Sequence, residues 1–105
     1  MAELTDADLE ALRLSAQVMG HKAVVEEHPL VGDFFVRLEE AFRERIAARG
    51  ADKRLVRPAR PALDAAAGDD DLRLVMEYLG LLAANERLSP AVRRVCRELQ
   101  AAFSR

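Results

Sequence analysis

Residues 30–49, LVGDFFVRLEEAFRERIAAR, decide the fold class of this chain. Apolar residues recur there at the spacing that places them on one face of an α-helix, which has about 3.6 residues per turn. Opposite charges stand four residues apart on the other face, in the pairs Asp33 with Arg37 and Glu39 with Arg43. The stretch therefore predicts an amphipathic helix. Its apolar stripe comprises Val31, Phe34, Phe35, Leu38, Ala41, Phe42 and Ile46.

The start signals of two further helices stand near the ends of the chain. Thr5 or Asp6 can cap the free N–H groups of a first helix, which we expect to run to about Glu27, because Pro29 disfavours helical geometry at the residue before it. Ser89 followed by Pro90 is a typical helix start, with the proline in the first turn. We expect the inward face of this last helix to carry Val92, Val95, Cys96, Leu99 and Phe103.

The segment from Asp69 to about Ala84 is apolar around most of a helical circumference. Its two apolar stripes leave only Arg73, Glu77, Gly80 and Ala84 for solvent. The main stripe comprises Leu72, Val75, Met76, Leu79, Leu82 and Ala83, and the second stripe comprises Leu74, Tyr78 and Leu81. A helix of this kind belongs in the centre of a fold. The sequence therefore predicts an all-α, single-domain antiparallel bundle over residues 1–105. We expect four main helices and a long 51–68 connection that contains a short helical turn, from Pro61 to Ala67.

Composition excludes several classes of function. The 105 residues fit one domain, and the net charge of −2 argues against a general polyanion binder. The single cysteine excludes an intramolecular disulfide and a cysteine-based zinc cage, and the dispersed glycines form no phosphate-binding loop. We expect a non-enzymatic protein with no cofactor and no metal. Because no apolar run is long enough to span a bilayer, we expect no membrane association and a cytoplasmic location.

The first helix carries two apolar stripes on nearly opposite sides. One is a core seam; the other, which we call the outer stripe, lies about half a turn away. Either a second chain covers the outer stripe, or the 51–68 connection covers it with Leu55, Val56 and Leu63. We favour the first, which predicts a homodimer. The core seam contains Leu9, Leu12, Ala16, Met19 and Ala23, and the outer stripe contains Leu14, Val18, His21, Val25 and His28.

Self-pairing of the outer stripe around a two-fold axis suggests a role for its histidines. In an antiparallel pairing centred near Val25, His21 of one chain approaches His28 of the other. Such a pair could bind a transition ion between the chains, or weaken the dimer as the imidazoles become charged in mildly acidic solution. We therefore expect dimerisation to depend on pH.

Basic residues gather in the 51–68 connection and on the last helix. Those of the connection, Lys53, Arg54, Arg57 and Arg60, lack interleaved aromatic residues for base stacking, which single-strand binders usually carry. An acidic protein partner fits them at least as well as a nucleic acid. Together with Arg93, Arg94 and Arg97 they form the candidate polyanion-binding set.

Residues 81–99, LLAANERLSPAVRRVCREL, resemble a helix-turn-helix segment. The resemblance implies that the helix after Ser89 enters the major groove of DNA, with Arg93, Arg94 and Arg97 contacting guanine edges or phosphates. Arg87 stands at the turn position where this family favours glycine. A solvated arginine face explains the same residues. The expected function is thus a self-associating protein-interaction module, accessory or regulatory, with a DNA-binding regulator as the alternative.

Overall fold

A computed structural model describes residues 4–47 and 66–103 of the chain. It contains four helices, α1 (Asp6–Val25), α2 (Pro29–Ala47), α3 (Asp69–Ala83) and α4 (Pro90–Ala102), and no strand in this part of the chain. The predicted all-α helical bundle is confirmed.

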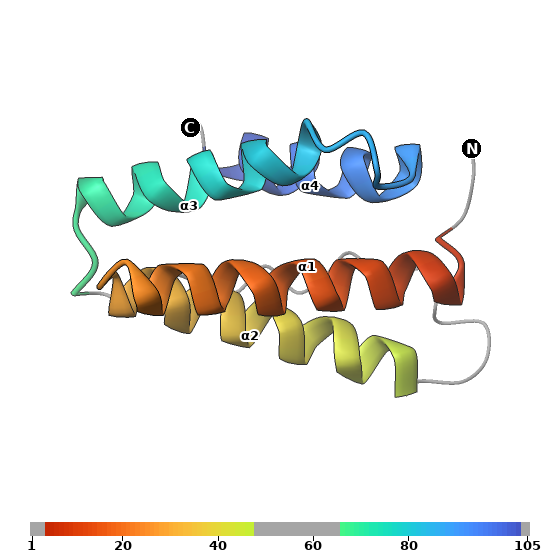
Figure 1. The fold of residues 1–105 in the computed structure, drawn as a ribbon, viewed down its shortest axis with the longest axis horizontal. Helices are drawn as coiled ribbons and strands as arrows, with labels where there is room; N and C mark the ends of the chain where they lie inside the picture. The colour runs from red at the N-terminus through yellow and green to blue at the C-terminus, as the bar shows by residue number, and fades with distance from the viewer. Residues whose placement is uncertain (1–3, 48–65, 104–105) are drawn as a thin grey trace.

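The helices form two antiparallel pairs that stack on each other. Figure 1 shows α1 and α2 side by side in the lower layer and α3 and α4 in the upper layer, all along the long axis of the molecule. Contacts are densest within each pair, and α2 with α3 and α1 with α4 join the layers. The long helix α1 therefore packs against α2 on one side and against the upper layer on another.

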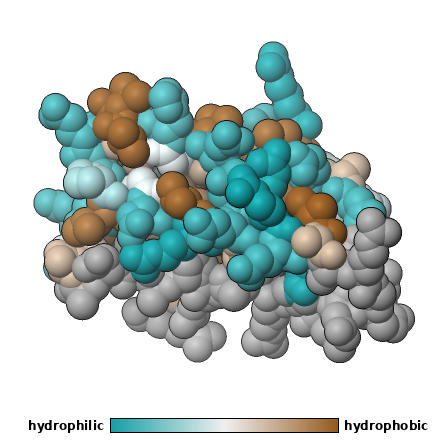
Figure 2. Space-filling model, turned by 90° about the horizontal axis from the view of Figure 1, so that it is seen from below, coloured by the Kyte–Doolittle hydropathy of each residue, from teal (hydrophilic) through white to brown (hydrophobic). Residues whose placement is uncertain are grey.

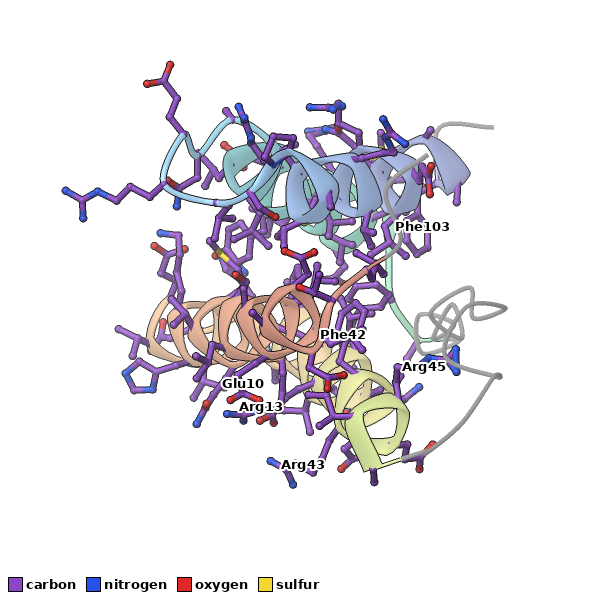
Figure 3. The ribbon with its side chains drawn as sticks, turned by 90° about the vertical axis from the view of Figure 1, so that its right-hand side faces the viewer. Glu10, Arg13, Phe42, Arg43, Arg45 and Phe103 are labelled. Carbon is purple, nitrogen blue, oxygen red and sulfur yellow. The ribbon has the colours of Figure 1, made fainter. Side chains whose placement is uncertain are left out.

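Apolar side chains from all four helices fill the space between the layers. Phe34, Phe35 and Phe42 of α2 are at most 2% exposed and are the largest fully buried side chains of this core. The Phe34 ring meets Phe35 edge-on at 5.1 Å between centroids and meets Phe103, just after α4, at 5.4 Å. Seen along the long axis, Phe42 and Phe103 lie between the ribbons of the two layers, whereas Arg43 points outward (Figure 3). The stripe that predicted α2 is thus the stripe that holds the layers together.

Both helix starts predicted from capping residues are confirmed. The Thr5 hydroxyl accepts the Asp8 N–H at 3.0 Å while the Asp8 carboxylate accepts the Thr5 N–H at 3.1 Å, a reciprocal capping box. The Ser89 hydroxyl accepts the Val92 N–H at 3.2 Å, and Pro90 occupies the first helical position of α4.

The turn between α1 and α2 begins earlier than the sequence predicts. The last residue of α1 is Val25, Glu26 caps the helix, and Glu27 adopts a left-handed backbone with φ of 65°. The His28 N–H then donates to the Ala23 carbonyl at 2.7 Å, and Pro29 opens α2. The prediction that α1 reaches Glu27 was two residues too long, because a left-handed residue reverses the chain there.

The predicted central position of α3 was wrong. Val75, Tyr78, Leu79 and Leu82 are buried, but Leu81 is 51% exposed. The reason is the two-layer arrangement, in which α3 has α4 beside it and the lower layer beneath it, so that one side still faces solvent. The second apolar stripe of α3 is therefore only partly covered.

Residues 51–65 of the predicted connection lie outside the described part of the chain. The same holds for Lys53, Arg54, Arg57 and Arg60, for most of the predicted turn from Pro61, and for the proposed covering residues Leu55, Val56 and Leu63. In the described end of the connection, Gly68 is the N-cap of α3, and its N–H donates to the Asp71 carboxylate at 3.0 Å. None of the described helices is long and apolar enough to cross a membrane.

Candidate protein-interaction surface

The outer stripe of α1 is exposed over most of its length. Leu14 is 46% exposed, Val18 is 59% exposed and Val25 is 64% exposed, and His21 between them is exposed as well. Large apolar side chains left this far in water on one helix face are typical of surfaces that contact another molecule. The structure therefore brings these four predicted residues together on one accessible ridge.

The opposite side of α1 explains why the stripe points outward. Leu9, Leu12, Ala16 and Ala23 are at most 2% exposed and pack into the core between the layers. Since successive helical residues are rotated by about 100°, Leu14, Val18 and Val25 lie on the far side of the helix from these four. Burying one side of α1 thus leaves the outer stripe unburied.

His28 does not belong to the ridge. It follows the left-handed Glu27, is half-buried, and lies in the turn to α2 instead of on the helix. The predicted helical alignment of His28 with His21 therefore fails, because the helix that would carry both ends at Val25. Within residues 4–47 and 66–103 no three potential metal-ligating side chains come together.

Two further valines widen the exposed apolar surface toward α2. Val24 is 62% exposed and Val36 of α2 is 46% exposed. A methyl group of Val24 lies 3.0 Å from the point where a Cβ on Gly32 would stand, and a methyl group of Val36 lies 3.9 Å from the corresponding point on Gly20. Both valines thus flank the close approach of α1 and α2. Figure 2 shows this side of the molecule, where apolar patches alternate with hydrophilic side chains.

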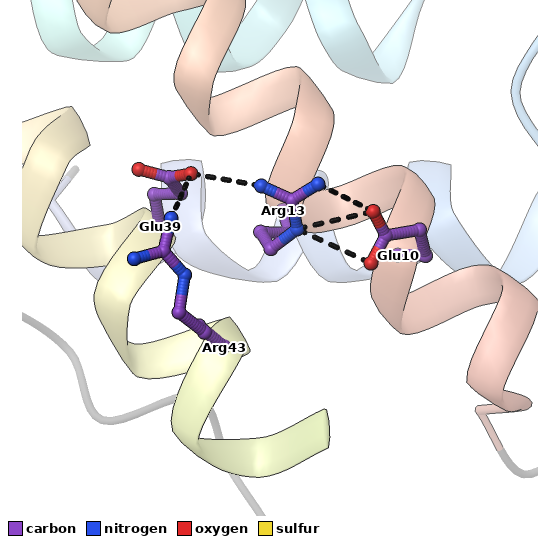
Figure 4. Close-up of polar contacts among 4 residues, drawn as sticks. All are labelled: Glu10, Arg13, Glu39 and Arg43. Atoms are coloured by element: carbon purple, nitrogen blue, oxygen red, sulfur yellow. Dashed lines mark hydrogen bonds and ion pairs between the residues drawn. The ribbon is translucent and has the colours of Figure 1, made fainter. Parts of the chain in front are cut away.

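A network of four charged side chains fixes α1 to α2 (Figure 4). Arg13 of α1 donates to Glu10 on its own helix and, at 2.9 Å, to Glu39 of α2, which also accepts from Arg43 at 2.9 Å. The hydrogen bonds that Arg13 donates to Glu10 lower the pKa of the Glu10 carboxyl. Because the Arg13 and Glu39 side chains are only 19% and 12% exposed, their ion pair is partly shielded from solvent and holds α1 in one orientation.

The C-terminal end of α1 is anchored to the upper layer through Tyr78 of α3. The Tyr78 hydroxyl donates to the Glu26 carboxylate, which also pairs with Lys22, and the Lys22 ammonium lies 5.4 Å from the centre of the Tyr78 ring. Burial, together with the bond to Glu26, raises the pKa of Tyr78 to about 12. Sequence patterning missed this contact, since it placed Tyr78 only in an apolar stripe of α3.

The candidate DNA-binding helix has a different geometry from the family it resembles. In a helix-turn-helix the two helices cross at about 90–120°. Here α3 and α4 run antiparallel side by side, as an αα-hairpin (Figure 1). Arg94 and Arg97 are exposed on α4, whereas Arg93 is half-buried. The arginines of α4 therefore lie on an antiparallel αα-hairpin, and not on the second of two crossed helices as in a helix-turn-helix.

Cys96 is enclosed by the core. Its side chain is 1% exposed, and burial raises the pKa of its thiol to about 11. A thiol with so high a pKa holds almost no thiolate at neutral pH, and the thiolate is the nucleophilic form. The side chain therefore acts in packing.

Comparisons of the chain with protein-family models, with curated proteins and with solved structures found no match.

Proposed function

We propose that this protein is a small, non-enzymatic, cytoplasmic interaction module, accessory or regulatory in role, that forms a homodimer through the ridge on α1 formed by Leu14, Val18, His21 and Val25. The exposure of Leu14, Val18 and Val25 on one ridge carries the proposal. Moving apolar surface out of water contributes about 25 cal/mol per Å², so three large side chains that are about half exposed are a substantial driving force. Their position on a helix that is fixed at both ends lowers the entropy lost on binding.

The surroundings of the ridge suit an interface between proteins. A stable interface buries at least about 1,000 Å² in total. A single helix ridge supplies less than this area. The exposed Val24 and Val36 extend the surface beyond the ridge, as do Glu10 and Arg43, the two more exposed members of the charged network. An apolar centre with charged side chains beside it is the common composition of such interfaces.

Sedimentation velocity over a wide range of protein concentrations tests self-association. We expect the wild-type chain to sediment as a dimer, and Val18→Glu to sediment as a monomer because it places a charge in the apolar centre. Leu81→Glu is the matched control: Leu81 is 51% exposed on α3, outside the ridge, and its replacement leaves the dimer intact. A wild-type monomer at every concentration, or equal loss of the dimer in both variants, overturns the proposal.

A double variant on α4, tested for both sedimentation and affinity for duplex DNA, separates this function from the alternative of DNA binding. Arg94→Ser/Arg97→Ser removes the two exposed arginines of α4 and leaves the ridge unchanged. We expect the double variant to keep the dimer. Wild-type affinity for duplex DNA that falls steeply with salt and is lost in the double variant would favour the DNA-binding alternative.

A further inference from the structure

We propose, building on self-association through α1, that the two chains pair antiparallel along the full length of this helix, with Leu14 of one chain against Val18 of the partner subunit. The inference concerns the orientation and register of the dimer. It rests on the spacing, the sizes and the charges of the side chains on α1.

The spacing along the ridge is that of a coiled-coil seam. With Ala7 and Ala11 added, the outward positions of α1 recur at alternating steps of four and three residues. Ala7 is exposed and Ala11 is half-buried at the edge of the core. The seam therefore covers the helix from its first turn to its last residue, in the order Ala7, Ala11, Leu14, Val18, His21 and Val25.

Helix length selects the register. Antiparallel pairing with Leu14 against the partner's Val18 places the two-fold axis near the middle of α1, so that both helices overlap over their full extent. The pairing centred near Val25 overlaps only the last residues of each helix, because α1 ends at Val25 and Glu27 reverses the chain. Full overlap buries every apolar member of the seam.

Side-chain size selects the orientation. The seam is small at its N-terminal end, with two alanines, and bulky at its C-terminal end, with His21 and Val25. In the antiparallel register Ala7 meets the partner's Val25, and Ala11 meets the partner's His21. A parallel pairing puts alanine against alanine at one end and histidine against histidine at the other, which leaves a gap and an imidazole contact.

Charge favours the same orientation. Asp6, Asp8 and Glu10 stand in the N-terminal half of α1, where Arg13 pairs with Glu10 and leaves an acidic excess. Lys22 stands near the C-terminal end of the helix and pairs there with Glu26 of its own chain. Antiparallel pairing brings the acidic half of each helix beside the partner's Lys22 and sets opposite helix dipoles next to each other. Parallel pairing places the acidic halves side by side, where they repel.

Cysteine cross-linking between full-length chains tests the register. Leu14→Cys and Val18→Cys are made separately, one of them tagged, then mixed and oxidised; the native Cys96 is buried and contributes little. We expect the mixed 14–18 disulfide to exceed both same-residue disulfides by at least severalfold, since a disulfide needs Cα atoms within about 7 Å. Leu81→Cys, exposed outside the ridge, is the control for random collision.

Each outcome decides between the two proposals. Predominant 14–14 or 18–18 disulfides in a chain that still sediments as a dimer support parallel pairing and overturn the register, but not self-association. Predominant disulfides of Val25→Cys with itself overturn it in favour of the pairing centred near Val25. A wild-type chain that sediments as a monomer overturns both proposals, and also identifies any cross-link as a collision product.

Discussion

The Ser89 hydroxyl donates a 2.8 Å hydrogen bond to the carboxylate of Asp8, 81 residues earlier in the sequence. This bond joins the start of α4 to the first turn of α1. Each partner is also a capping residue: Ser89 accepts the Val92 N–H, and Asp8 accepts the Thr5 N–H. One pair of side chains therefore completes two helix starts and connects the lower layer to the upper one.

We expect Ser89→Ala to destabilise the fold by about 1–2 kcal/mol, because it removes both the cap of α4 and the bond to Asp8. Ser89→Thr keeps the hydroxyl and is the matched control, with a much smaller loss. Urea unfolding followed by circular dichroism measures the free energy of unfolding of each variant. Equal stability of Ser89→Ala and the wild type would show that the pair contributes nothing.

Acid should weaken the same connection. Burial raises the pKa of Asp8, but hydrogen bonds from Thr5 and Ser89 outweigh it, so the net pKa is lowered in the folded chain. The unfolded chain then binds more protons than the folded chain as the pH falls below about 4, so the contribution of Asp8 is present above that pH and is lost on acidification. We expect Asp8→Asn to lose less stability between pH 5 and pH 3 than the wild type, as measured by the urea midpoint at each pH. An identical loss in both proteins would contradict the assignment.

Alanine substitutions at two helical glycines, Gly20 and Gly80, should stabilise the chain to different extents. A Cβ on Gly20 stands 3.5 Å from the Phe35 Cβ, an ordinary contact, so Gly20→Ala should stabilise the chain by about 0.5–1 kcal/mol through helix propensity. A Cβ on Gly80 stands 2.9 Å from the Gln100 amide nitrogen, which donates to the Met76 carbonyl. Gly80→Ala therefore displaces this amide and gains less. Thermal unfolding of both variants checks the order, and a larger gain at Gly80 would contradict it.

The sequence predicts what depends on local pattern, and fails where distant parts of the chain decide. The starts of α1 and α4 follow from Thr5 and Ser89, whose caps involve residues within one turn. The exposure of Leu81 depends on how the two layers stack, which apolar spacing within α3 does not specify.

Within the candidate surface the same distinction applies. Leu14, Val18 and Val25 were found because helical spacing alone puts them opposite the core seam. His28 was misplaced because one left-handed residue ends the helix before it, and Val24 and Val36 were missed because their exposure depends on the approach of α1 to α2. The contact of Tyr78 with Glu26, 52 residues away, leaves no signal in either helix.

Alkaline titration isolates the contact of Tyr78, because it is the single tyrosine in a chain without tryptophan. Burial and the bond to Glu26 raise its pKa to about 12 in the folded chain, against about 10 in an unfolded one. The stability from this contact is therefore fully present below about pH 10 and is lost as the pH rises toward 12. We expect the phenolate absorbance of the native protein to rise at clearly higher pH than that of the chain in guanidinium.

Substitutions on either side of the bond separate burial from hydrogen bonding. Glu26→Gln removes the acceptor charge and should lower the pKa of Tyr78 only in part, since burial, the larger cause, remains. Tyr78→Phe should cost about 1 kcal/mol at neutral pH and abolish the tyrosine part of the alkaline loss of stability. Glu77→Gln is the matched control on α3: Glu77 acts on Tyr78 only through its charge, so its replacement should move the titration least. A native titration that coincides with that of the unfolded chain would mean that the Tyr78 hydroxyl faces water, and that α1 is not anchored to α3 at this point.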